Sequence, residues 1–321
     1  MEIAVLGAGA LGSIISAHLA RAGESVQLIA RGERALNLQQ NGITITGLSE
    51  FNVWCPVITD TNDLTGKDVL ILAVKTHDVE SAISDLSGKK FGSVLSVQNG
   101  VYGNEQLAKA FGVEQTLGAT ASFSGEVTPQ GEVKFTANAG FFIGELPTGT
   151  SPRVNALAKM LNSAGINTEA TPDIQSLQWS KFVLWVAYTL IAVITRLATY
   201  RFLSDEHTSL LCVRIMREMA TIANHRAISL KDVGMPVLSV VDDTEENALM
   251  TLTQLGRELE HSAPDHKMSA LQDLESGKKL EIEETLGYAV SEALKLDLAV
   301  PILDVCYGLI KGINLSNLKT V

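Results

Sequence analysis

Cysteine is scarce in this chain of 321 residues, and its basic residues are outnumbered by acidic ones. The three cysteines, Cys55, Cys212 and Cys306, are odd in number and widely spaced, which argues against a disulfide framework or a metal site and favours a reduced, cytoplasmic setting. With 25 basic and 36 acidic residues, the formal net charge of −11 argues against a surface for nucleic acid or anionic membrane. We therefore expect a small molecule as the partner.

Long hydrophobic runs are also missing. The longest, Phe182 to Thr195, lies between Lys181 and Arg196 and is too short to span a bilayer comfortably, so we expect a buried helix there. The chain opens without the basic segment of a signal peptide, and it contains no low-complexity block or internal repeat. Its length and its 46% hydrophobic and 19% charged residues predict a globular protein of two domains.

A glycine-rich turn follows an apolar run at the very start of the chain. The run Ile3 to Leu6 predicts a strand, and the helical pattern after the turn ends at Gly23. In this context Gly7 permits a tight turn, Gly9 lets a pyrophosphate approach the backbone, and Gly12 lets the helix pack on the strand. The sequence thus predicts a dinucleotide site made by Gly7, Ala8, Gly9, Ala10, Leu11 and Gly12.

The end of the second predicted strand, Val26 to Ala30, indicates which dinucleotide binds. An enzyme that uses NAD normally carries an acid there for the ribose hydroxyls, whereas this chain has Arg31. A guanidinium suits a 2′-phosphate, because it offers bidentate, charge-assisted hydrogen bonds. We therefore predict NADPH/NADP as the cofactor, with Arg34 as a second contributor. The alternative is that both arginines are solvated surface charges, with a neighbouring acid on the ribose.

Strands and helices alternate through the first half of the chain. Asp68 to Val74 and Val94 to Val97 are predicted strands, and Val79 to Leu86 is a predicted helix between them. This alternation predicts a Rossmann-type, doubly wound parallel α/β sheet. From Gly118 to Leu146 the pattern changes to short strand-like pieces, broken at residues 128–131 and 139–140, which predict antiparallel hairpins.

The pattern becomes almost wholly helical after Thr171-Pro172-Asp173. We therefore predict an NADP-binding Rossmann domain over residues 1–173 and an all-helical substrate and catalytic domain over residues 174–321. Ligands of open α/β sheets bind beyond the carboxyl ends of the strands, so the helical half should cover that edge and supply part of the site.

Two loops at the carboxyl ends of predicted strands carry candidate polar groups. Asn99 could orient a nicotinamide or a carbonyl substrate, and Lys75 offers a cation for phosphate or carboxylate. Against this, Asn99-Gly100 is also a favoured turn pair. His77 has no evident partner and is not taken as an acid or base.

In the helical half, Lys181, Trp185 and Thr189 are spaced to share one face of the apolar helix. A second candidate segment, Ser269 to Glu283, carries several acids and lysines around a helix-breaking Ser276-Gly277. Composition alone favours an ordinary charged surface for it.

Taken together, these residues resemble the ketopantoate reductase family, the 2-dehydropantoate 2-reductases. The resemblance runs from end to end and rests on the glycine turn, Arg31, Val74-Lys75, Gln98-Asn99-Gly100, Trp179-Ser180-Lys181 and the stretch Ser269 to Ile282. It implies reduction of a 2-oxo acid by NADPH, most simply ketopantoate to pantoate in pantothenate biosynthesis, and a homodimer.

The resemblance also implies roles for individual residues, which their spacing in the sequence does not indicate. Lys181 would be the general acid, and Glu281 would bind a substrate hydroxyl and help to hold the lysine. Asn99 and Ser269 would contact the substrate, and Lys75 would lie near the cofactor or the substrate. A lysine ammonium can stabilise the oxyanion that hydride transfer produces and then supply its proton.

One departure from the family pattern concerns the substrate. The family usually has asparagines four and eight residues after the lysine, where this chain has Trp185 and Thr189. Since a lost polar contact weakens recognition of a substrate hydroxyl, the reaction type could persist with a different oxo or hydroxy acid. A non-catalytic NADP-binding sensor is a more distant alternative, and the retention of Lys181 and Glu281 argues against it.

Overall fold

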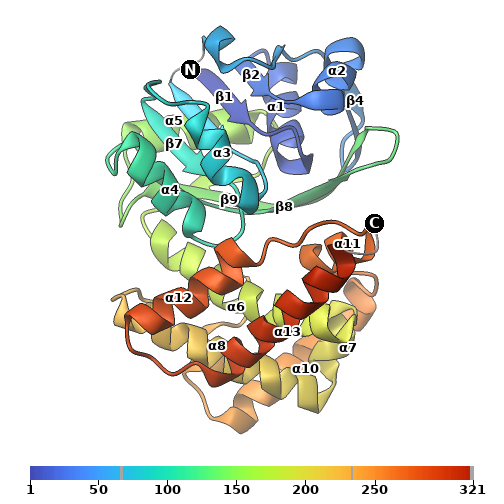
Figure 1. Ribbon diagram of the computed structural model, residues 1–321, viewed down its shortest axis with the longest axis vertical. Helices are drawn as coiled ribbons and strands as arrows, with labels where there is room; N and C mark the ends of the chain where they lie inside the picture. Colours follow the sequence, from blue (N-terminus) through green and yellow to red (C-terminus); the bar gives the residue numbers. More distant parts are fainter. Residues whose placement is uncertain (66–67, 233, 319–321) are drawn as a thin grey trace. The chain divides into compact units, whose positions relative to one another are not determined.

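The computed structural model describes residues 1–65, 68–232 and 234–318. The chain divides into two compact units, unit 1 over residues 1–178 and unit 2 over residues 179–321 (Figure 1). Helix α6 (Ile174–Thr195) runs across this division, with its first residues in unit 1 and the remainder in unit 2.

Unit 1 contains the predicted parallel sheet, which confirms the α/β class. Its five strands stand in the order β5-β2-β1-β6-β7, all parallel. Leu6 pairs with Ile29 on one side and with Leu72 on the other, so the carboxyl ends of the central strands lie together. The order reverses beside β1, which is where sheets of this kind bind ligands. The strands are β1 (Glu2–Leu6), β2 (Ser25–Ile29), β5 (Val57–Ile58), β6 (Val69–Leu72) and β7 (Ser93–Ser96).

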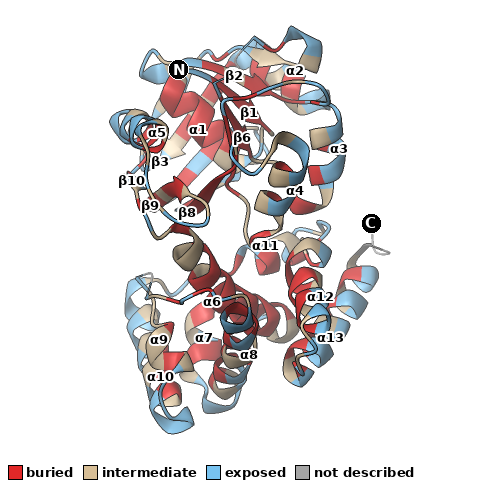
Figure 2. Ribbon diagram, turned by 90° about the vertical axis from the view of Figure 1, so that its left-hand side faces the viewer, coloured by how far each residue is buried: buried red, intermediate tan, exposed pale blue. Residues whose placement is uncertain are grey.

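Alternate residues of β1 are buried on opposite faces of this sheet. Ile3 and Val5 join one hydrophobic cluster, which also contains Ile14 and Ile15 of the helix after the glycine turn. Ala4 and Leu6 join a second cluster on the other face. Figure 2 shows the strands of this sheet buried between helices. A strand covered on both faces has no polar side, which is why the sequence reads there as a continuous apolar run.

A second sheet, not foreseen from the sequence, completes unit 1. It runs β10-β9-β3-β4, with β8 paired to β9 in one long antiparallel hairpin. The expected break at residues 128–131 is confirmed as the turn of this hairpin, where Gly131 N–H donates to Thr128 O at 2.9 Å. The strands are β3 (Ile43–Gly47), β4 (Phe51–Val53), β8 (Leu117–Val127), β9 (Val133–Glu145) and β10 (Thr168–Ala170).

The break expected at Ala139-Gly140 is wrong, because β9 continues through it. Asn167 Nδ2 donates to Ala139 O at 3.2 Å, and Asn138 Oδ1 accepts from Asn167 N–H at 3.0 Å. A Cβ on Gly140 would lie 2.9 Å from the Phe142 ring. The glycine therefore makes room for a neighbouring ring within a strand and does not mark a turn.

Helices cover both sheets of unit 1. The one after the glycine turn begins at Ala10 and ends at Arg21, with Gly23 at φ +80° just beyond. The helices are α1 (Ala10–Arg21), α2 (Gly32–Asn41), α3 (Val79–Ser84), α4 (Tyr102–Phe111) and α5 (Pro152–Ser163), with short turns η1 (Thr61–Asp63) and η2 (Thr76–Asp78).

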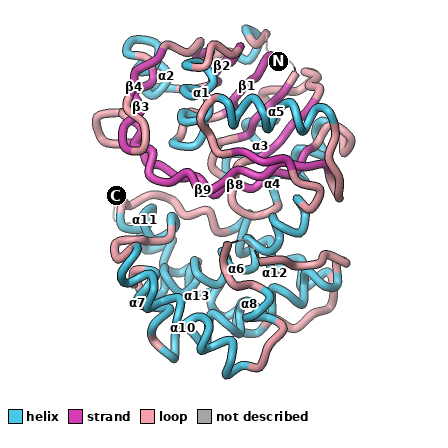
Figure 3. Tube along the Cα trace, turned by 180° about the vertical axis from the view of Figure 1, so that it is seen from behind, coloured by secondary structure: helices cyan, strands magenta, loops and turns pink. Residues whose placement is uncertain are grey.

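The described residues of unit 2 form helices joined by loops, with no strand among them, as expected (Figure 3). Helix α6 is long and apolar enough to cross a membrane by length and composition, but 83% of its most apolar window is buried inside the protein. The expected buried helix is thus confirmed. The further helices are α7 (Thr199–Ser204), α8 (Glu206–His225), α9 (Leu238–Val241), α10 (Glu245–Ser262), α11 (Ser269–Glu275), the π-helix η3 (Glu283–Gly287), α12 (Tyr288–Lys295) and α13 (Pro301–Leu318).

Candidate active site

The glycine turn meets three different constraints at its three glycines. Gly7 has φ +115°, and a Cβ there would lie 2.7 Å from Val74 N. A Cβ on Gly12 would lie 2.0 Å from Gly7 O, so helix α1 can pack this closely only on glycine. Around Gly9, by contrast, a Cβ would meet no described heavy atom within 4 Å.

Open space above Gly9 coincides with the start of α1. Gly9 is the N-cap of this helix and supplies no side-chain cap, so the first N–H groups of α1 point toward that space. Ala8, Ala10 and Leu11 pack against the hydrophobic cluster below. This arrangement fits a pyrophosphate, which needs backbone donors and close approach.

Arg34 has a role in this turn that the sequence did not indicate. Its Nε donates to Ala8 O at 3.1 Å, and its Nη2 donates to Ser13 Oγ at 3.2 Å. Its Nη1 donates to Gly131 O at 2.6 Å, in the turn of the β8–β9 hairpin. Burial lowers the pKa of the Arg34 guanidinium. Arg34 therefore ties the glycine turn to the second sheet, where we had expected a phosphate contact.

Arg31 lies where the sequence predicted it, just past the end of β2. It is the N-cap residue of α2, and its guanidinium forms an ion pair with the Asp85 carboxylate. The two side chains are 59% and 45% exposed. Asp85 is therefore an acid beside Arg31, and the alternative interpretation of the sequence requires such an acid.

The two loops expected at the carboxyl ends of β6 and β7 are joined by Gln98. Its Nε2 donates to Val74 O at 2.6 Å, and its Oε1 accepts from Ser96 Oγ at 3.0 Å. Lys75 follows Val74 directly as the N-cap of η2, and Asn99 follows Gln98. In the sequence, Gln98 stands out only as part of the motif Gln98-Asn99-Gly100. Its position directly after a buried strand and before Asn99 is the signal that could have identified it.

His77 occupies the turn η2 in the same loop. Its Nε2 lies 3.7 Å from Asp78 Oδ2, and its side chain is 18% exposed. Because Asp78 is itself exposed, this contact does not make His77 a candidate catalytic residue.

In unit 2, Lys181 lies in an otherwise apolar part of α6. The surrounding protein lowers the pKa of Lys181 to about 8, because burial disfavours the ammonium form. Trp185 and Thr189 follow on the same face, and both are buried. The Thr189 hydroxyl has no hydrogen-bond partner among the described residues. A lysine with a pKa near neutral can donate a proton at physiological pH.

The second candidate segment of unit 2 contains Ser269 and Glu281. Ser269 is the first residue of α11, which stops at Ser276-Gly277 where Gly277 takes φ +68°. Glu281 lies between two buried residues, Leu280 and Ile282, just before the π-helix η3. Asn314 Oδ1 on α13 accepts from Leu280 N–H at 3.1 Å and holds this segment in place. Single π-helical turns are frequent at functional sites.

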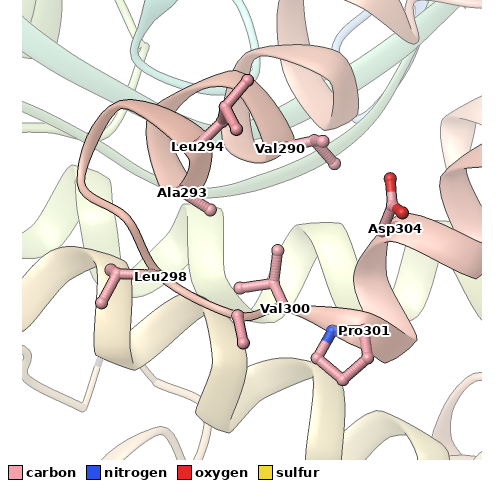
Figure 4. Close-up of a pocket in the computed structure, with 8 residues that line it drawn as sticks. Val290, Ala293, Leu294, Leu298, Val300, Pro301 and Asp304 are labelled. Carbon is pink, nitrogen blue, oxygen red and sulfur yellow. The ribbon is translucent and has the colours of Figure 1, made fainter.

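The candidate site residues form no metal site, and none of them lines the apolar pocket of unit 2. Within residues 1–65, 68–232 and 234–318, no three His, Cys, Asp or Glu side chains are grouped to hold a metal ion. The pocket, of about 380 Å³, lies between α12 and α13 (Figure 4). Its lining residues are Val290, Ala293, Leu294, Leu298, Ala299, Val300, Pro301 and Asp304.

The parallel sheet with its glycine turn, together with a helical unit that carries a lysine of lowered pKa, defines a dinucleotide-dependent oxidoreductase. The family model described as ketopantoate reductase PanE/ApbA matches residues 3–148, and the model for the C-terminal part of that family matches residues 173–314. This chain belongs to the ketopantoate reductase PanE/ApbA family, which confirms the resemblance.

Individual relatives agree over the full length of the chain. A protein of Pyrococcus abyssi (strain GE5 / Orsay), named 2-dehydropantoate 2-reductase, is 28% identical over 314 residues, covering 97% of each chain. The crystal structure of a PanE/ApbA family ketopantoate reductase from Ralstonia eutropha JMP134 is 25% identical with a TM-score of 0.83, covering 99% of each chain. A complex of D-mandelate dehydrogenase with NADH, 18% identical with a TM-score of 0.82, covers 98% of this chain and 99% of its own and shares the fold.

Proposed function

We propose that this protein reduces 2-dehydropantoate to pantoate with NADPH. The observation that carries the proposal is Lys181, a lysine with a pKa of about 8 in the unit that the C-terminal family model matches. The name of the Pyrococcus abyssi relative supports the substrate. We propose residues 1–173 as the NADP-binding domain and residues 174–321 as the substrate and catalytic domain. The homodimer and the cytoplasmic location stay predictions.

The proposed cofactor contacts all lie in unit 1. The N–H groups at the start of α1 would hold the pyrophosphate over Gly9, and Arg31 would bind the 2′-phosphate. Lys75 and Asn99, whose loops are joined by Gln98, would lie near the nicotinamide end and the substrate. NADPH, when bound, supplies the hydride that reduces the carbonyl carbon.

The proposed chemistry of the protein itself is proton donation. As the carbonyl oxygen gains negative charge, the Lys181 ammonium stabilises that charge and then donates a proton from Nζ to the oxygen. Glu281 would bind a substrate hydroxyl and help to hold the lysine, and Ser269 and Asn99 would contact the substrate. Trp185 and Thr189 are the proposed neighbours of the substrate on α6.

A different oxo acid is the second candidate substrate. The observation that favours it is Trp185, a buried aromatic side chain where the family pattern has an asparagine. An indole fills volume and cannot accept a hydrogen bond, so recognition of a substrate hydroxyl would be weaker. A substrate without that hydroxyl would bind no more weakly beside Trp185 than beside an asparagine.

Oxidation of NADPH at 340 nm with ketopantoate and a panel of other 2-oxo acids tests both candidates. We expect turnover to fall by about 10²- to 10⁴-fold in Lys181→Ala, the usual range for removal of a general acid. Lys159→Ala, on the exposed side of α5, should leave turnover unchanged. Since the acid must be protonated, kcat/KM of the unmodified protein should fall as the pH rises through about 8. A better substrate in the panel would favour the second candidate, and turnover that survives in Lys181→Ala would contradict both.

A further inference from the structure

The ion pair between Arg31 and Asp85 joins two parts of unit 1 that are far apart in the sequence. Asp85 follows the last residue of α3, and its backbone is held on two sides. Its N–H donates to Ser81 O at 3.3 Å, and its carbonyl accepts from Thr61 Oγ1 at 2.7 Å. The carboxylate therefore stands on a fixed stretch of backbone beside the guanidinium.

This ion pair lies beside the proposed cofactor site. Gly7 N–H donates to Ile29 O at 3.0 Å, which brings the end of β2 against the glycine turn. Arg31 comes two residues after Ile29. In a doubly wound sheet, the group at this position meets the adenosine ribose of a dinucleotide.

A carboxylate at this point affects the two nicotinamide cofactors in opposite ways. A 2′-phosphate carries negative charge, so it must compete with Asp85 for Arg31 and is repelled by the carboxylate. The 2′-hydroxyl of NADH is a hydrogen-bond donor, which a carboxylate can accept. The guanidinium thus suits one cofactor and the carboxylate suits the other.

We propose that Asp85 is a specificity-determining residue that narrows the preference for NADPH over NADH by competing with the 2′-phosphate for Arg31. This inference rests on the proposed function, in which Arg31 binds that phosphate. The protein should then use both cofactors measurably. Its kcat/KM should be higher with NADPH than with NADH, but by a smaller factor than if Arg31 had no competing carboxylate beside it.

Titration calorimetry with two small probes tests the proposal without any turnover. Adenosine 2′,5′-bisphosphate carries the 2′-phosphate, and adenosine 5′-monophosphate carries the free hydroxyl. In Asp85→Asn we expect the bisphosphate to bind about two- to fivefold more tightly, a size typical of exposed charge interactions, with no gain for the monophosphate. The gain should shrink as salt is added, since both charges are exposed.

Two further variants separate the pairing from a general change of charge. Glu169→Gln, on the exposed face of β10, makes the same acid-to-amide change elsewhere in unit 1 and should leave both affinities as they are. In an Arg31→Gln background the effect of Asp85→Asn should be much smaller, because the group for which the two anions compete is gone.

The kinetic counterpart is the ratio of kcat/KM with NADPH to kcat/KM with NADH, which should rise in Asp85→Asn by the same factor. Unchanged or weaker binding of the bisphosphate to Asp85→Asn would overturn the proposal, as would failure of the unmodified protein to bind either probe. If the probes bind as expected but no 2-oxo acid is reduced, the inference stands and the proposed reaction fails.

Discussion

Gly9 and Gly12 stand three residues apart in the same turn, and an added methyl group should have opposite consequences at the two positions. Gly9 has φ −70°, which alanine adopts easily, and the space around it is open. We expect Gly9→Ala to fold with nearly unchanged thermal stability but to bind NADPH at least about tenfold more weakly, because the methyl group occupies the space of the pyrophosphate. Fluorescence titration with NADPH and a thermal melt measure the two quantities.

Gly12→Ala is the contrasting variant. Its methyl group would lie 2.0 Å from Gly7 O, so the start of α1 would have to move. We expect a loss of stability of about 1 to 3 kcal/mol, as for other overpacked sites. Equal melting temperatures for Gly9→Ala and Gly12→Ala would contradict the prediction that only Gly12 is needed for the packing of α1.

Lys181 lowers the stability of the folded protein, and this effect can be measured apart from catalysis. Because its pKa is lowered to about 8 in the folded protein, the unfolded chain holds this proton more tightly, and folding with the lysine charged is penalised. The penalty is complete below pH 8 and is relieved as the pH rises toward the ordinary lysine value. We therefore expect Lys181→Met to be more stable than the unmodified protein at pH 7, by about 2 to 3 kcal/mol.

Urea unfolding at pH 7 and at pH 10 checks this expectation. The stabilisation by Lys181→Met should be large at pH 7 and much smaller at pH 10. Lys159→Met, at an exposed position of α5, should give no such pH-dependent gain. A destabilised Lys181→Met at pH 7 would contradict the assignment of burial as the cause of the lowered pKa.

Among the elements of unit 1, the carboxyl-end loops of β6 and β7 are joined by the side chain of Gln98. Methionine in place of Gln98 keeps the length of the side chain but loses the bond to Val74 O, which leaves the Lys75 loop without this support. We expect kcat/KM with NADPH to fall about tenfold, since small misplacements of binding groups can cost up to about 10²-fold. Steady-state kinetics with NADPH varied measures the change.

Gln106→Met is the matched control for Gln98, because it makes the same substitution on the neighbouring helix α4. It should keep the kinetic constants of the unmodified protein. A small loss of stability shared by both variants, without a kinetic change in Gln98→Met, would reduce Gln98 to an ordinary structural contact.

The elements of the first half could be predicted where a local rule decides them. The apolar run of β1 and the helical stripe to Gly23 depend on neighbouring residues, so both predictions are confirmed. The strand β9 was misinterpreted at Gly140, because only the Phe142 ring and the Asn138–Asn167 contacts explain why the chain does not turn there. The second sheet was missed for the same reason, since β3 and β9 pair across a long stretch of sequence.

For the molecule as a whole, the sequence indicated the family, the fold and the individual polar residues, but few of their partners. Arg31 was found from its position after a strand, whereas Asp85 directly follows a helix more than fifty residues later. The bonds of Arg34 to Gly131 and of Gln98 to Val74 likewise join segments that only the folded chain brings together. No periodicity predicts such pairs, because each depends on the packing of complete elements.

Helix α6 begins in one unit and continues in the other, and this affects how the gene could be recombined. Ile174 fills the space beside Gly118 and Gly144, and Gln178 donates to Ala119 O at 2.7 Å and accepts from Asn104 Nδ2 at 3.0 Å. The start of the helix is therefore fitted to the sheet that it packs against. A chimera between two relatives would need its crossover inside this helix, after residue 178, and a joint placed in the preceding loop would graft a foreign first turn onto the sheet.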